Sequence, residues 1–281
     1  MLGFTSNQEF GRLPVAECLA CTHRFLPHPP TATALAAFYD RFYDDARSSA
    51  RAPRPGLRDR ALVRTLRQRL PRNARVLDIG ANRGATLSAF PEGCRLEGVE
   101  PSVTAAAVAA RDPRLTIHNV PVEALDLPER TFDCVVSLAV IEHVRDTRGY
   151  LRTIERLLAP GGCAVLMTGD WATWQGRRMG PQWHLYHSDG HLHFFSARSL
   201  ETALGAAGLR VRDRMWVGPN PISSRLPKAL GRALHCQTTT LMVPALFGRR
   251  PLGDHVYVWV ERAAPCPPAH AVGISDHTIV P

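Results

Sequence analysis

Apolar residues recur along this chain with two different periods. Between residues 75 and 169, short apolar runs alternate with longer stretches in which apolar residues return every three or four positions. Short runs bounded by turn residues predict buried strands, and the longer spacing predicts helices. The predicted strands are 75–80, 94–100, 114–120, 132–140 and 163–169, and the predicted helices begin at 84, 102 and 149.

The flanking segments extend this pattern. Helical spacing predicts helices over 31–45 and 57–70 before the first strand, and a helix over 198–209 near the other end. Two further strands are predicted at 210–217 and 255–263. Residues 169–195 are predicted to form a long loop, and the first 30 residues a small irregular appendage; 218–252 give no clear pattern.

Alternating strands and helices predict an α/β fold, because each helix carries the chain back to start the next parallel strand. We expect a Rossmann-like, seven-stranded, mostly parallel sheet with helices on both faces, forming a three-layer αβα sandwich. Such a sheet binds ligands at the carboxyl ends of its strands, where the strand order reverses. The expected organisation is an appendage at 1–30, the main domain at 31–262 and a tail at 263–281.

Composition narrows the range of functions. Hydrophobic residues make up 45% and charged residues 21%, as in ordinary globular proteins. The chain lacks an apolar run of the roughly 18–20 residues that a membrane span needs, and a signal peptide is not evident, so we expect a cytoplasmic protein without membrane contact. The net charge of +9 comes almost entirely from dispersed arginines, without a docking motif, so nucleic acid is not an expected partner. The seven cysteines are mostly isolated and predict no disulfide framework.

The segment VLDIGANRG carries the first candidate site. It places Asp78 at a strand end and Gly80 and Gly84 in the turn that follows. Dinucleotide-binding turns have a middle glycine where this chain has Asn82, whose side chain would crowd a pyrophosphate. S-adenosylmethionine has no phosphate and tolerates that residue. Glu100 ends the next strand, where an acidic side chain accepts hydrogen bonds from ribose hydroxyls in both kinds of site.

The chain resembles the class I S-adenosylmethionine-dependent methyltransferases over residues 31–262. The most specific part is the run VEALDLPERTFDCVVSLAVIEHV, followed by LRTIERLLAPGGCAVLMT. The resemblance implies that the glycine turn faces the methionine portion of the cofactor, that the acidic strand end binds ribose, that a segment after the third strand lies against adenine, and that the loop after the fourth strand borders the sulfonium. The cofactor-binding residues implied are Asp78, Gly80, Ala81, Asn82, Gly84, Glu100, Pro101, Val122, Glu123, Leu138, Ala139 and Tyr43. Two positions depart from the family pattern: Asn82 replaces a glycine and Pro121 an aspartate.

Histidines supply the candidate chemistry at the methyl acceptor. His143 follows the fourth strand and can act as a general base, since an unperturbed imidazole titrates near neutrality; the alternative is a histidine that only packs. The loop WHLYHSDGHLHFFS carries four more, of which His191 best matches a histidine that lines the active-site mouth in related methyltransferases. We predict that this loop lines the substrate site, with core packing as the alternative. Its H-x-x-H…H-x-H spacing lacks a helix-borne ligand pattern, so no metal is predicted.

Aromatic residues near these segments have two interpretations. Trp171, Trp174 and Trp183 either wall an apolar acceptor or belong to the core. Tyr39 and Tyr43 resemble tyrosines on a helix that caps the cofactor in some relatives, or they form a packing face of the helix at 31–45.

The pair Cys18 and Cys21 resembles the second half of a small zinc ribbon found in one methyltransferase subgroup. Structural zinc needs four ligands, and this segment offers two cysteines, with His23 as a third candidate. We therefore predict a degenerate, metal-free ribbon.

These features together predict an S-adenosylmethionine-dependent methyltransferase. Because no separate recognition domain is evident, the expected acceptor is a small molecule, methylated at oxygen, nitrogen or carbon. The alternatives are a non-catalytic Rossmann-like binding module and, with less support, an NAD(P)-dependent oxidoreductase.

Overall fold

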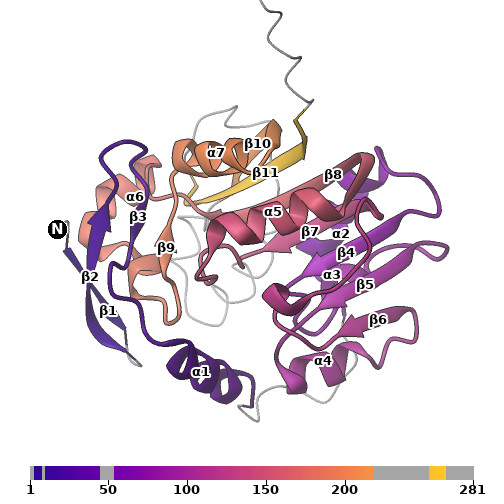
Figure 1. Ribbon diagram of the computed structural model, residues 1–281, viewed down its shortest axis with the longest axis horizontal. Coiled ribbons are helices and arrows are strands. Elements are labelled where there is room, and N and C mark those ends of the chain that lie inside the picture. The colour runs from indigo at the N-terminus through magenta and orange to yellow at the C-terminus, as the bar shows by residue number, and fades with distance from the viewer. Residues whose placement is uncertain (1–2, 8–9, 45–53, 218–252, 264–281) are drawn as a thin grey trace, which may run out of the picture.

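A seven-stranded sheet forms the centre of the protein in the computed structural model (Figure 1), which describes residues 3–7, 10–44, 54–217 and 253–263. The strands lie in the order β10-β11-β8-β7-β4-β5-β6. Their bounds are β4 Arg75–Ile79, β5 Arg95–Val99, β6 Leu115–His118, β7 Phe132–Leu138, β8 Leu158–Gly169, β10 Leu209–Val217 and β11 His255–Arg262.

The pairing confirms the mostly parallel sheet. The strands from β6 to β8 pair in parallel, and β11 and β10 are antiparallel additions at one edge. Chain order reverses between β4 and β7, because β4 pairs with β5 on one side and with β7 on the other. The carboxyl ends of β4 and β7 therefore border the point at which such sheets bind ligands.

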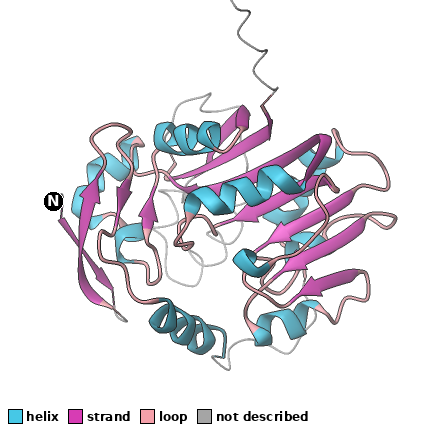
Figure 2. Ribbon diagram, viewed as in Figure 1, coloured by secondary structure: helices cyan, strands magenta, loops and turns pink. Residues whose placement is uncertain are grey.

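Helices cover both faces of the sheet (Figure 2), as the sequence predicts. On one face, α5 (Thr147–Leu157) and α7 (Ala197–Ala206) pack on the sheet; on the other lie α2 (Leu57–Arg67) and α3 (Ala85–Ser88). The strands alternate between the two cores, so that Leu77 and Ile79 belong to the first and Val76 to the second. This period of two is the geometry of a strand buried on both faces. The remaining helix at the β6 edge is α4 (Val103–Ala109), which begins at a Ser102 cap.

The first 30 residues are more regular than the sequence analysis expects. A second sheet has the order β1-β2-β3-β9, with β1 Gly3–Asn7, β2 Gly11–Glu17, β3 Arg24–Phe25 and β9 His193–Phe194. The prediction of irregular structure is wrong here because β9, which completes the sheet, comes from a distant part of the chain. Val15, Leu26 and Phe194 are buried between this sheet and the segment around Trp183.

Three 3-10 turns and two helices of the described chain connect these parts. The long loop after β8 contains α6 (Trp174–Met179) and two 3-10 turns, η2 (Gly180–Gln182) and η3 (His184–His187). A further turn, η1 (Val122–Ala124), follows β6, and α1 (Ala32–Asp44) leads from the N-terminal sheet. Over the described ranges, none of the helices combines the length and apolar character that crossing a bilayer requires.

Candidate active site

The turn after β4 has the backbone that its glycines predict. Gly80 and Gly84 both have φ of +78°, and Asn82 reaches φ +49°, in the left-handed region that Asn tolerates better than most residues. A Cβ at position 80 would lie 2.4 Å from Cγ2 of Val140. Asn82 thus keeps the turn that a glycine would make, so this departure from the family pattern does not break the loop. The contact with Val140 joins the turn directly to the loop after β7.

Glu100 is fixed at the end of β5. Its side chain is buried, and its two carboxylate oxygens accept hydrogen bonds from the backbone N–H groups of Asn82 (2.8 Å) and Ser102 (2.9 Å). Burial raises the pKa of this carboxyl, and the two N–H groups partly offset that effect. The carboxylate that the sequence assigns to ribose therefore also holds the glycine turn against the neighbouring strand.

Asp78 brings a second buried carboxylate to the same place. Burial raises its pKa to about 8, and the negative charges of Asp59 and Glu100 add to the rise. Asp59, on α2, is itself buried and accepts hydrogen bonds from the Gly56 N–H and the Thr86 hydroxyl. Three carboxyl groups thus surround the turn. This arrangement suits a cationic ligand and opposes a pyrophosphate, which would add negative charge.

The predicted adenine and sulfonium contacts lie on the neighbouring strand ends. Val122 and Glu123 form η1, and the Asn119 side chain ties the end of β6 to the carbonyls of Glu100 (2.8 Å) and Pro101 (3.1 Å). This tie places the segment before η1 beside the end of β5.

On the sulfonium side, Leu138 ends β7 and the exposed Ala139 follows it with φ +56°. Backbone strain of this kind in a residue with a side chain is concentrated at functional sites. Ala81 is buried in the glycine turn. Tyr43 is in the last turn of α1, and its side chain lies outside the described part of the structure.

The two predicted catalytic histidines lie side by side. The ring centroids of His143 and His191 are 4.6 Å apart with an interplanar angle of 74°. Nδ1 of His143 is 2.7 Å from the Tyr39 hydroxyl and 3.0 Å from the Gly190 carbonyl oxygen, and Nδ1 of His191 is 3.1 Å from the Leu185 carbonyl oxygen. Burial, with a smaller effect of the nearby His143, holds the pKa of His191 well below its usual value, so this ring is neutral.

The other histidines of the loop point to different neighbours. His184 lies 3.4 Å from the buried Asp254 carboxylate, and His187 is 3.0 Å from the Pro181 carbonyl oxygen. His193 Nδ1 is 3.0 Å from His23 Nε2 in the N-terminal sheet, and burial lowers the pKa of both rings to about 4. Of the loop histidines, His191 therefore lies beside His143, and His184 lies at a separate carboxylate. The substrate-lining role of the loop stays a prediction.

The three tryptophans of this loop lie in different environments. Trp183 is 1% exposed and belongs to the core beneath the N-terminal sheet, while Trp171 stacks on the guanidinium of Arg24. Trp174 is 63% exposed. Core packing is thus the interpretation that holds for Trp183, and Phe194 and Phe195 of the same loop are also buried.

Cys18 and Cys21 lie in the turn between β2 and β3. Backbone N–H groups of Cys21 and Ala20 lower the pKa of the Cys18 thiol, as in a metal-binding knuckle. His23 is directed to His193. Among the described residues, the group of His, Cys, Asp and Glu side chains close enough to share an ion does not include either cysteine. The degenerate, metal-free ribbon stays a prediction.

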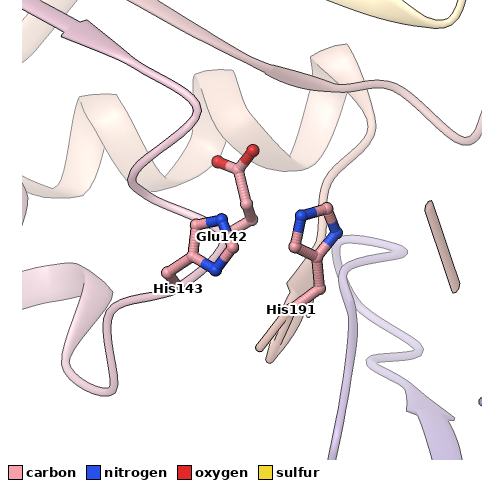
Figure 3. A group of neighbouring side chains, drawn as sticks. All are labelled: Glu142, His143 and His191. Atoms are coloured by element: carbon pink, nitrogen blue, oxygen red, sulfur yellow. The ribbon is translucent and has the colours of Figure 1, made fainter. Parts of the chain in front are cut away.

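Sequence reasoning missed three residues of this site. Glu142 precedes His143 in the chain, and its carboxylate lies within 4.8 Å of a ring nitrogen of each predicted catalytic histidine (Figure 3). Asp59 gave no signal, because a charged residue in the first turn of a helix usually faces water. Tyr39 was considered only as a cap or a packing residue, whereas its hydroxyl contacts His143. Adjacency in the motif IEHV was the available signal for Glu142.

Comparison with known proteins identifies the family. A family model described as a methyltransferase domain matches residues 51–213, more than half of the chain. The ubiquinone biosynthesis O-methyltransferase of Rhodopseudomonas palustris (strain TIE-1) is 31% identical over 163 residues, covering 54% of this chain and 64% of that protein. The chain thus spans slightly less than two thirds of the length of that relative.

Solved structures share the fold. The 1,6-didemethyltoxoflavin-N1-methyltransferase of Burkholderia thailandensis, with its substrate and S-adenosylhomocysteine bound, superposes with a TM-score of 0.54 at 19% identity, covering 89% of this chain and 100% of that one. Geranyl diphosphate C-methyltransferase of Streptomyces coelicolor A3(2) gives 0.56 at 14% identity, covering 84% and 100%. The architecture is Rossmann-like. The chain belongs to the class I S-adenosylmethionine-dependent methyltransferase family.

Proposed function

We propose that this protein transfers a methyl group from S-adenosylmethionine to a hydroxyl group of a small-molecule acceptor. The observation that carries the proposal is the contact between the two halves of the site. The glycine turn packs on Val140, and the backbone N–H of His143 donates to the Val140 carbonyl oxygen at 2.9 Å. One short loop therefore connects the predicted cofactor pocket to the histidine pair.

The residues present fit the cofactor. S-adenosylmethionine supplies an electrophilic methyl group on a positively charged sulfonium. Asp78 is a buried carboxyl that a bound cation would ionise, and Glu100 retains acceptor capacity for ribose hydroxyls beyond its two backbone donors. The three carboxyl groups around the turn support this ligand over a nicotinamide dinucleotide.

The acceptor side fits a protic nucleophile. Methyl transfer needs the attacking atom aligned and, for a hydroxyl, relieved of its proton. His143 is positioned to accept that proton, with Glu142 and the neutral His191 beside it. The name of the R. palustris relative, an O-methyltransferase, supports oxygen as the methylated atom. The structural neighbours named above methylate nitrogen and carbon, so the fold by itself does not select the atom.

The experiment combines binding with turnover. Calorimetry of the purified full chain should show saturable binding of S-adenosylmethionine and S-adenosylhomocysteine and no heat with NADH. Radiolabelled methyl transfer to a panel of phenols, alcohols and amines should favour hydroxyl compounds. His143→Gln should lower kcat at least tenfold with an unchanged Kd for S-adenosylmethionine. Absence of cofactor binding at millimolar concentration would instead support the non-catalytic binding module, and transfer only to amines would refute the choice of oxygen.

A further inference from the structure

Glu142, His143 and His191 bring one carboxylate and two imidazoles to a common point. Each offers one ligand atom, and these atoms all lie within 4.8 Å of one another. Figure 3 shows the three side chains directed toward one another from two segments, the turn after β7 and the loop before β9. The H-x-x-H…H-x-H spacing lies within one loop, so it gives no sign of a ligand set assembled from two separate segments.

The outer contacts leave the inner ligand atoms free. A carbonyl oxygen only accepts, so the contacts of His191 with Leu185 O (3.1 Å) and of His143 with Gly190 O (3.0 Å) are hydrogen bonds when the ring protons are on Nδ1. In that tautomer the Tyr39 hydroxyl, 2.7 Å from the same Nδ1 of His143, is a second acceptor. The Nε2 lone pairs then remain for a ligand. Histidines that bind metals characteristically donate their second ring N–H to a backbone carbonyl or a carboxylate in this way.

The Glu142 side chain is also oriented by a hydrogen bond to a residue outside the cluster. This side chain is 4% exposed, and one oxygen, Oε2, accepts a hydrogen bond from the Thr168 hydroxyl at 2.9 Å. Across the described residues, no hydrogen bond joins this carboxylate to either imidazole. The site is therefore not a closed hydrogen-bonded triad; its inner atoms converge without pairing with each other.

The backbone holds the two segments together independently of these side chains. The N–H groups of Leu192 and His193 donate to the Glu142 carbonyl oxygen at 2.8 and 3.2 Å. The ligand atoms are thus positioned before any ion arrives, which reduces the ordering cost of binding.

We propose that Glu142, His143 and His191 bind one divalent first-row transition ion, with zinc as the reference case, at the acceptor end of the active site. Two imidazoles and one carboxylate suit zinc and its neighbours, whereas magnesium and calcium prefer oxygen ligands. Three protein ligands leave a coordination position open, as in catalytic sites. The acceptor hydroxyl occupies that position.

The proposal rests on the proposed methyl transfer and changes how the hydroxyl is activated. The ion lowers the pKa of the bound hydroxyl, whose proton passes to solvent. The oxygen then forms a bond to the methyl carbon while the carbon–sulfur bond breaks, and the electron pair remains on sulfur, giving S-adenosylhomocysteine. His143 acts as a ligand in this scheme, and it acts as the direct base only if no ion is needed.

Metal titration of the untagged full chain tests the site. After treatment with a chelator, the protein should bind one equivalent of Zn²⁺ by calorimetry, and Co²⁺ should give a visible absorption band that Zn²⁺ abolishes. Glu142→Gln and His191→Gln should each weaken Zn²⁺ binding at least tenfold and remove the band. His187→Gln, on the same loop but outside the cluster, is the matched control and should retain both.

Cofactor binding separates this proposal from the proposed function. Wild-type protein and Glu142→Gln should bind S-adenosylmethionine with the same Kd, which also shows that the variant is folded. Chelated wild-type protein with full methyl transfer, or Zn²⁺ binding unchanged in both cluster variants, would overturn the metal site and leave the methyltransferase intact. Failure of the wild type to bind S-adenosylmethionine would overturn the proposed function, whatever the metal stoichiometry.

Discussion

The raised pKa of Asp78 predicts that cofactor binding releases a proton. With a pKa of about 8, the carboxyl is about one-tenth ionised at pH 7 in the ligand-free protein. A bound cation favours the ionised form of the carboxyl. The affinity for S-adenosylmethionine therefore rises with pH until the carboxyl is already ionised in the ligand-free protein, and it is constant above that pH. The expected tightening between pH 6 and pH 8 is about 50-fold, from the ratio of ionised fractions at those values.

Calorimetry in buffers of different ionisation enthalpy measures this proton directly. At pH 7 the difference in binding enthalpy between buffers should correspond to nearly one proton released per cofactor bound. Asp78→Asn should remove the release and flatten the pH profile, which also reveals any contribution from the amino group of the ligand. Asp59→Asn should shift the profile to lower pH, because one of the neighbouring negative charges is lost. A wild-type affinity that is independent of pH, with no proton exchanged, would refute the assignment of Asp78 to this site.

Three substitutions test other parts of the structure. Glu100→Gln should raise the Kd for S-adenosylmethionine at least tenfold, about the effect of losing a charged hydrogen-bond acceptor; Glu97→Gln, on the same strand but ion-paired away from the site, should not change the Kd measured by calorimetry. Tyr39→Phe removes the hydroxyl next to the proposed base and should lower kcat about fivefold at constant cofactor affinity. A parallel loss of affinity would assign the tyrosine to a cofactor cap instead. Gly84→Ala forces a side chain into φ +78° and should cost about 1–3 kcal/mol in urea unfolding, whereas Gly205→Ala, with open space around it, should be neutral or stabilising.

The main sheet was predictable because its signals are local. The strand predicted at 75–80 is β4 at Arg75–Ile79, and the helix predicted at 57–70 is α2, which ends at Arg67. Apolar runs, glycine turns and capping residues all act within a few positions, so each element is visible without its neighbours. The sequence predicts the ends of helices less accurately, because the formation of the last turn depends on the residues that pack against it.

The N-terminal sheet and the acceptor end of the site depend on distant contacts. β3 forms its ladder with β9, and Glu142 meets His191 only after the loop following β8 returns to the sheet. Such pairings leave no periodic trace in either segment alone. The same reason explains why His143 and His191 were found as separate candidates and their common neighbour was not. The prediction for residues 218–252 falls outside the described residues.

The strand β9 gives the N-terminal segment a part in the active site. β9 follows His191 almost directly, and it is hydrogen-bonded to β3 on one side while Leu192 and His193 bind the carbonyl of Glu142 on the other. The N-terminal sheet, through β3, therefore holds in place the loop that carries one of the proposed ligands. Shortening the protein to residues 31–262 would remove β3 and so release His191. The N-terminal segment therefore contributes, through backbone hydrogen bonds, to the position of a proposed ligand.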